Sequence, residues 1–74
     1  MKALSQATKD QVDGALEKMY ERMHSSHTDE EVMATLQIVI RKINQIGKEK
    51  PTIAHLTNYI SEKIQEHLDI MSLG

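Results

Sequence analysis

A helix-starting motif at Thr28 constrains this sequence more than any other feature. The side-chain oxygen of Thr28 can accept a hydrogen bond from the Glu31 N–H, while the Glu31 carboxylate reaches back to the Thr28 N–H. The apolar residues that follow recur at helical spacing and form a stripe wide enough to pack against two neighbours. We therefore predict a central helix over residues 29–46, although its β-branched run at 38–40 is also typical of strands. The stripe consists of Val32, Met33, Leu36, Val39, Ile40, Ile43 and Ile46.

A turn and another amphipathic helix follow. Gly47 is expected to end the central helix in the left-handed conformation, because glycine has no Cβ to clash there. Pro51 forces Lys50 out of helical geometry. This leaves Thr52 as the cap of the third helix, or Lys50 if Pro51 takes the first helical position. The third helix is predicted over residues 52–70, and its apolar face contains Ile53, Leu56, Tyr59, Ile60, Ile64, Leu68 and Met71.

The chain before Thr28 predicts a first helix over residues 9–24. Ser5 or Thr8 can cap its start, and apolar residues recur at helical spacing up to Met23. Gly14 in its interior either weakens the helix or lets another helix approach closely. Residues 24–27 break the apolar pattern and are expected to form a loop. The sequence thus predicts an all-α fold with one domain, residues 1–74, in which three helices include a helix-turn-helix-like hairpin.

The small size of the chain limits its core. A chain of 74 residues buries only about 60% of the surface that its unfolded form exposes. Cysteine is absent, so neither a disulfide nor a thiolate metal site can reinforce the fold. Small domains of this kind are often reinforced by association, and we predict a homodimer. The predicted interface is the C-terminal seam of the third helix, formed by Tyr59, Ile60, Ile64, Leu68 and Met71.

Methionine is frequent, with five residues in this short chain. Four of them, Met19, Met23, Met33 and Met71, lie within or at the ends of the apolar faces. An unbranched thioether repacks easily, so the set favours an adaptable contact surface, whereas the favoured role of any single methionine is to fill a gap in the core. We therefore expect some of these side chains to contact a partner protein. Binding of another protein through an apolar helical surface is the leading functional prediction.

Basic side chains cluster around the turn between the second and third helices. Helix-turn-helix proteins read DNA with their second helix, and polar residues begin the third helix here. Glu62, Glu66 and Asp69 follow in the same helix and would repel a duplex. DNA binding is therefore the alternative functional prediction. Its contact residues would be Arg41, Lys42, Lys48, Lys50, Thr52 and His55.

The histidines do not indicate a metal site. His24 and His27, with Asp29 and Glu30, are workable ligands for a transition metal. A closed zinc site, however, needs four ligands that the structure holds in place, and these residues lie in a predicted loop. We therefore expect no bound metal and no cofactor.

Catalysis and membrane insertion are also not expected. His55 and His67 have no acid or nucleophile aligned with them in the sequence, and three short helices leave little room for an enclosed pocket. We predict that the protein is not an enzyme and has no small-molecule substrate. No segment approaches the roughly 18 uninterrupted apolar residues of a membrane span, and the N-terminus has no secretory pattern. A cytoplasmic location is therefore expected.

The second and third helices carry a resemblance to a known family. Gly47 and Lys48 form a Gly-basic turn, and Leu56, Tyr59 and Ile60 follow on the next helix. This pattern resembles the small enterobacterial biofilm-development and two-component-system connector proteins of the YmgB/AriR-like group. The resemblance implies an all-helical dimer that acts in stress or biofilm regulation through protein contact or DNA contact.

Overall fold

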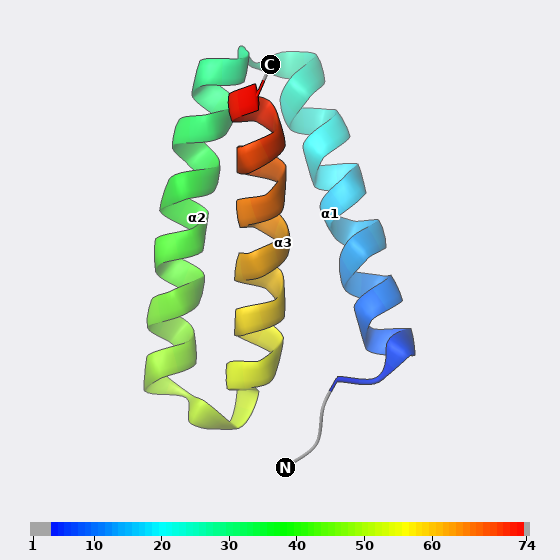
Figure 1. The fold of residues 1–74 in the computed structure, drawn as a ribbon, viewed down its shortest axis with the longest axis vertical. Coiled ribbons are helices and arrows are strands. Elements are labelled where there is room, and N and C mark those ends of the chain that lie inside the picture. Colours follow the sequence, from blue (N-terminus) through cyan, green and yellow to red (C-terminus); the bar gives the residue numbers. More distant parts are fainter. Residues whose placement is uncertain (1–3, 74) are drawn as a thin grey trace.

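The fold is a bundle of three α-helices in a computed structural model that describes residues 4–73. Figure 1 shows the hairpin of the second and third helices, with the first helix tilted beside it. The predicted all-α architecture with three helices is confirmed, and each helix is longer than the sequence predicts. The elements are α1 (Gln6–Ser26), α2 (Asp29–Glu49), a short 3₁₀ helix η1 (Pro51–Ile53) and α3 (Ala54–Leu73).

The core lies between α2 and α3. Val32 and Leu36 of α2 meet Ile64 and Leu68 of α3, and all four are buried. Small polar residues let the two helices approach closely: Ser61 is buried, and its hydroxyl donates to Asn44 Oδ1 at 2.8 Å. The two helices run in opposite directions (Figure 1), and most of the packing between elements is between them.

Helix α1 is held more loosely. None of its residues is buried, and its C-terminal half packs half-buried side chains against the core. In Figure 1 the start of α1 lies farther from α3 than its end does. The side chains that α1 contributes to the core are Leu16, Met19, Tyr20 and Met23.

The start of α2 has the predicted capping box. The Glu31 N–H donates to Thr28 Oγ1 at 3.2 Å, and the Thr28 N–H donates to Glu31 Oε1 at 2.9 Å. The hydrogen bond from the Thr28 backbone is the main reason why the pKa of Glu31 is lowered. Ser5 caps α1 in the same way, because its Oγ accepts from the Thr8 N–H at 3.2 Å.

The predicted loop at residues 24–27 is wrong for most of its length. Helix α1 continues to Ser26, and the His27 N–H closes its last turn on the Met23 carbonyl at 2.9 Å. The hydroxyls of Ser25 and Ser26 donate to the Arg22 carbonyl at 2.9 and 2.8 Å. Serine is accommodated in a helix by such bonds to the preceding turn.

The predicted role of Gly47 is also wrong. Helix α2 continues to Glu49, and no residue between positions 4 and 73 has a positive φ. Gly47 instead allows α3 to approach, since a Cβ there would collide with Thr57 Oγ1 and lie 3.3 Å from Thr57 Cβ. Gly14 has no such neighbour, because nothing lies within 4 Å of the equivalent position.

The connection after α2 differs from the prediction in its cap. Lys50 has left helical geometry before Pro51, as predicted, with φ −127° and ψ 80°. Thr52, however, is not the cap of α3, because it lies inside η1. Pro51 occupies the start of η1, which is the arrangement expected when Lys50 is the flanking residue.

Within the described residues, no helix has the length and apolar character that a membrane span requires.

Candidate functional site

The predicted dimer seam is largely occupied by the chain's own packing. Ile64 is 0% exposed and Leu68 is 4% exposed, both in the core. Ile60 and Met71 are half-buried against the same core. The hydroxyl of Tyr59 donates to Asp13 Oδ1 on α1 at 2.8 Å. A second copy therefore cannot reach Ile64 or Leu68 unless the domain opens.

The predicted DNA-contact residues all lie on the surface near the end of the hairpin. The ion pairs formed within residues 4–73 involve none of these six side chains. Helices α2 and α3 lie side by side in opposite directions (Figure 1), whereas the two helices of a helix-turn-helix cross at roughly 90–120°. DNA contact stays a prediction. The exposed residues are Arg41, Lys42, Lys48, Lys50, Thr52 and His55.

A stack of rings joins α1 to α3. The rings of Tyr20 and His67 are 3.8 Å apart between centroids and inclined by only 3°. His67 Nε2 lies 3.0 Å from Nε2 of His24, 43 positions earlier in the chain. The other ring nitrogen of His24 lies 3.4 Å from Asp29 Oδ1 at the start of α2. The four side chains thus link all three helices at one end of the bundle.

The hydrogen bond between the two histidines requires opposite roles for their nitrogens. One Nε2 must carry a hydrogen and donate it, and the other Nε2 must be unprotonated to accept the hydrogen bond. Two protonated rings therefore cannot form this bond. Burial lowers the pKa of His67, and the nearby His24 lowers it further. A lowered pKa favours the neutral form of His67 at neutral pH, which is compatible with the shared hydrogen bond. The sequence contains no local pattern that reveals this pair.

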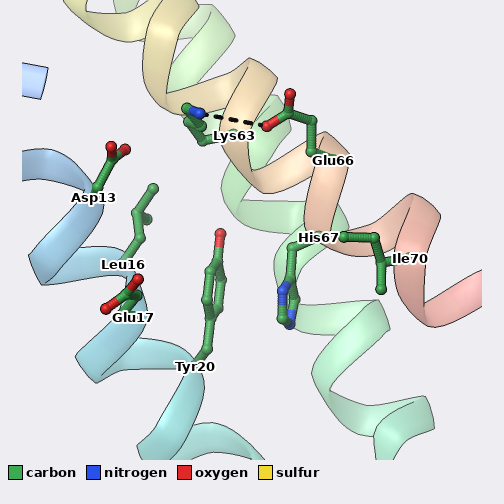
Figure 2. A pocket seen from close by; sticks show the side chains of 8 residues that line it. All are labelled: Asp13, Leu16, Glu17, Tyr20, Lys63, Glu66, His67 and Ile70. Carbon is green, nitrogen blue, oxygen red and sulfur yellow. Dashed lines mark ion pairs between the residues drawn. The ribbon is translucent and has the colours of Figure 1, made fainter.

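A shallow groove beside this stack separates α1 from α3. Figure 2 shows the Tyr20 ring parallel to His67, with its hydroxyl directed toward the Lys63–Glu66 ion pair, whose atoms are 3.6 Å apart. The buried Tyr20 hydroxyl has no hydrogen-bond partner among the described residues. Its pKa is raised by burial and, to a lesser extent, by the charges of Glu66 and Asp13. The groove has a volume of about 270 Å³ and is also lined by Leu16, Glu17 and Ile70.

Two polar side chains of this groove join α1 to α3: Asp13 accepts from Tyr59 at 2.8 Å, and His67 bonds His24 at 3.0 Å. No hydrogen bond within the described part of the chain joins a hydroxyl nucleophile to His67, whose recorded partner is His24. His27, considered above as a metal ligand, forms a hydrogen bond with Ser26 Oγ at 2.8 Å. Among residues 4–73, no group of three or more His, Cys, Asp or Glu side chains could hold a metal ion.

A second hollow lies on α1 alone. It is lined by Ala15, Lys18, Met19, Arg22 and Met23 and has a volume of about 460 Å³. We call it the Met groove. Two of the methionines predicted to form a contact surface therefore lie in one hollow.

Large aliphatic side chains are also exposed elsewhere. Ile38 and Ile46 lie on α2, and Ile53 lies in η1. Ile70 and Leu73 lie on α3 within one helical turn of each other and are 66% and 87% exposed. The sequence assigned Ile46 and Ile53 to the apolar faces of the second and third helices, but it did not place Ile38, Ile70 or Leu73 on either face.

Comparisons of the chain with protein-family models, curated proteins and solved structures found no match. The resemblance to biofilm and connector proteins therefore stays a prediction.

Proposed function

We propose that this chain is a small non-enzymatic regulatory protein that binds another protein, or a second copy of itself, through apolar side chains on its helices. One observation carries the proposal: more large aliphatic side chains are exposed than are buried. Among residues 4–73, four apolar residues are buried in the core, whereas five large Ile and Leu side chains are exposed. Burying these exposed side chains against a partner would stabilise the complex by about 25 cal/mol for each Å² of apolar surface removed from water.

The C-terminal turn of α3 is the most exposed part of this apolar surface. Ile70 and Leu73 are three positions apart, so they lie next to each other on the helix. We call this pair the terminal patch. If the protein forms the predicted homodimer, the terminal patch replaces the buried seam as its contact, because both of its side chains are accessible without opening the core.

The test compares association of the wild-type chain with that of Ile70→Glu/Leu73→Glu. If the partner is a second copy, we expect light scattering on a size-exclusion column to show a dimer that the double variant does not form. If the partner is another protein, the wild-type chain should capture it and the double variant should not. Gln11→Glu/Gln37→Glu is the matched control, because it adds the same charge at exposed polar positions. A wild-type chain that stays monomeric and captures nothing specific contradicts the proposal. A stress or biofilm role rests on the sequence resemblance alone.

DNA binding is the alternative, and the exposed basic residues around the hairpin turn favour it. Lys48 and Lys50 are exposed and form no ion pair within the described residues. If DNA is the partner, Lys48→Glu/Lys50→Glu should remove binding to a duplex, and wild-type binding should weaken steeply as salt rises. Unchanged duplex binding in this variant would rule out the turn as the contact.

A further inference from the structure

The Met groove occupies one face of the C-terminal half of α1. Ala15, Met19 and Met23 are four residues apart, so they succeed one another along the helix, and Lys18 and Arg22 run beside them with the same spacing. The groove is therefore an apolar track with a basic edge. The groove is about two helical turns long, so it suits a helical segment of a partner better than a single side chain or a flat surface.

Thioethers form the floor of this track. Met19 and Met23 are half-buried, with one side packed against the core formed by α2 and α3. Their remaining surface lines the groove. An unbranched thioether can change rotamer at small cost, so the floor can adapt to the side chains of a partner.

The edge of the track carries two basic side chains that form no ion pair within the part of the chain that the structure describes. Lys18 and Arg22 are both exposed, and the ion pairs formed within residues 4–73 are Lys63–Glu66 and His24–Asp29. Glu17 and Glu21 balance these charges along α1 but do not line the Met groove, so the positive charge is a feature of the groove edge alone. Complementary charge steers association and sets its register.

On the basis of the function proposed above, we infer that the Met groove receives an acidic amphipathic helix of another protein. Apolar side chains of that helix, three or four residues apart, would rest on Met19 and Met23. Its Asp or Glu side chains would pair with Lys18 and Arg22. The same groove of a second copy is a poor occupant, because α1 would bring its own Lys18 and Arg22 against identical charges.

The test uses two synthetic helical peptides with the same stripe of Leu and one Trp. Glu flanks the stripe in the acidic peptide, and Lys replaces each Glu in its basic twin. Because the chain has no Trp, peptide fluorescence reports binding directly. NMR of the methionine methyl groups then locates the peptide. We expect the acidic peptide alone to bind, with its largest shifts at Met19 and Met23 and small shifts at Met33 and Met71.

Charge reversal makes the test specific. Lys18→Glu/Arg22→Glu should weaken binding of the acidic peptide by about tenfold or more and should allow the basic twin to bind. Arg41→Glu/Lys42→Glu is the matched control, since it makes the same charge change at exposed positions of α2 and should leave affinity within about twofold. Circular dichroism of both variants checks that the helices are intact.

Three outcomes would overturn the inference. These are equal binding of the two peptides, an equal loss in the α2 control, and methionine shifts that appear with protein concentration before any peptide is added. The last outcome would assign the groove to a second copy. If the Ile70→Glu/Leu73→Glu variant still abolishes association in these cases, the inference about the Met groove fails while the proposed function stands. If neither the groove nor the terminal patch binds anything, both fail.

Discussion

Gly47 and Gly14 both lie inside helices, but only Gly47 faces another helix at close range. Alanine at Gly47 would place a Cβ against the side chain of Thr57, whose Cβ lies 3.3 Å away. We expect Gly47→Ala to lower the free energy of unfolding by about 1–3 kcal/mol, as overpacking does. Gly14→Ala should raise it by about 1 kcal/mol, because the position is open and alanine favours the helix. Urea unfolding followed by circular dichroism measures both changes.

A second substitution separates crowding from other causes. Thr57→Ala removes the hydroxyl that meets the added Cβ. The double variant Gly47→Ala/Thr57→Ala should therefore recover most of the stability that Gly47→Ala alone loses. If Gly47→Ala is as stabilising as Gly14→Ala, then α3 does not approach α2 as closely as described.

Contacts between neighbours in the sequence could be predicted, whereas contacts between helices could not. The hydrogen bonds between Thr28 and Glu31 join residues three positions apart, so their pattern is local and was predicted correctly. The contact of Gly47 with Thr57 depends on how two helices pack. The sequence therefore suggested the commoner use of glycine, as a helix terminator. The His24–His67 pair depends on the packing of α1 against α3, which periodicity does not determine.

At the scale of elements, α1 depends on a few side-chain contacts with the hairpin. It has no buried residue, and it is joined to α3 by the Tyr20–His67 stack, the His24–His67 hydrogen bond and the Tyr59–Asp13 hydrogen bond. Elements with few buried contacts open at lower free energy than the rest of a protein. The attachment of α1 should therefore respond to changes that leave the hairpin intact.

Acidification is one such change. Burial lowers the pKa of His67 in the folded chain below the value of about 6.5 that it has when unfolded. The unfolded chain, or a chain with α1 detached, therefore binds a proton more readily than the folded chain. The stability contributed by neutral His67 is complete above about pH 6.5 and is lost as pH falls toward the folded pKa. The protection of α1 amides against hydrogen exchange, relative to the intrinsic exchange rate at each pH, should fall over this interval before that of α2 and α3.

His67→Gln tests this dependence, and His55→Gln is its matched control. His55 is exposed and makes no side-chain hydrogen bond within the described residues. The carboxylates beside the ring stack, Asp29 and Glu66, are retained in both variants. We expect His67→Gln to reduce the slope of stability against pH between about pH 7 and 5, and His55→Gln to preserve it. Equal slopes in both variants would contradict the assignment.

The apolar faces of the helices were easier to predict than their partners. Periodicity correctly placed Ile64 and Leu68 on an apolar face, but it could not tell whether α2 or a second copy would cover them. The structure covers them with α2. In the same way, the sequence recognised Met19 and Met23 as candidates for contact, whereas their position beside Lys18 and Arg22 in one hollow required the packed helix.

At the scale of the whole molecule, the core is small enough for one side chain to decide stability. Leu36 is fully buried, and truncation of a buried leucine to alanine typically removes about 2–5 kcal/mol. A domain of this size gains only about 3–5 kcal/mol from its core. We therefore expect Leu36→Ala to be largely unfolded, with its helical circular dichroism and cooperative melting lost.

Ile70→Ala is the corresponding control at the surface. Ile70 is 66% exposed, so its truncation should change the free energy of unfolding by less than about 0.5 kcal/mol. A cooperative transition in Leu36→Ala similar to that of Ile70→Ala would show that the core extends beyond the four buried residues. The comparison also shows why association should be tested at Ile70 and Leu73: a charge at Ile64 would unfold the chain before any interface could be examined.

The hairpin described above also has a consequence for how the chain reaches its native state. Only Lys50 and the single turn of η1 separate α2 from α3, so the entropy lost in closing that loop is small. Within residues 4–73, every buried residue belongs to one of these two helices. The hairpin should therefore form the folding nucleus, with rapid kinetics typical of proteins whose contacts are local. Helix α1 would dock afterwards. During synthesis, α2 and α3 must therefore both be completed before α1 can pack against them.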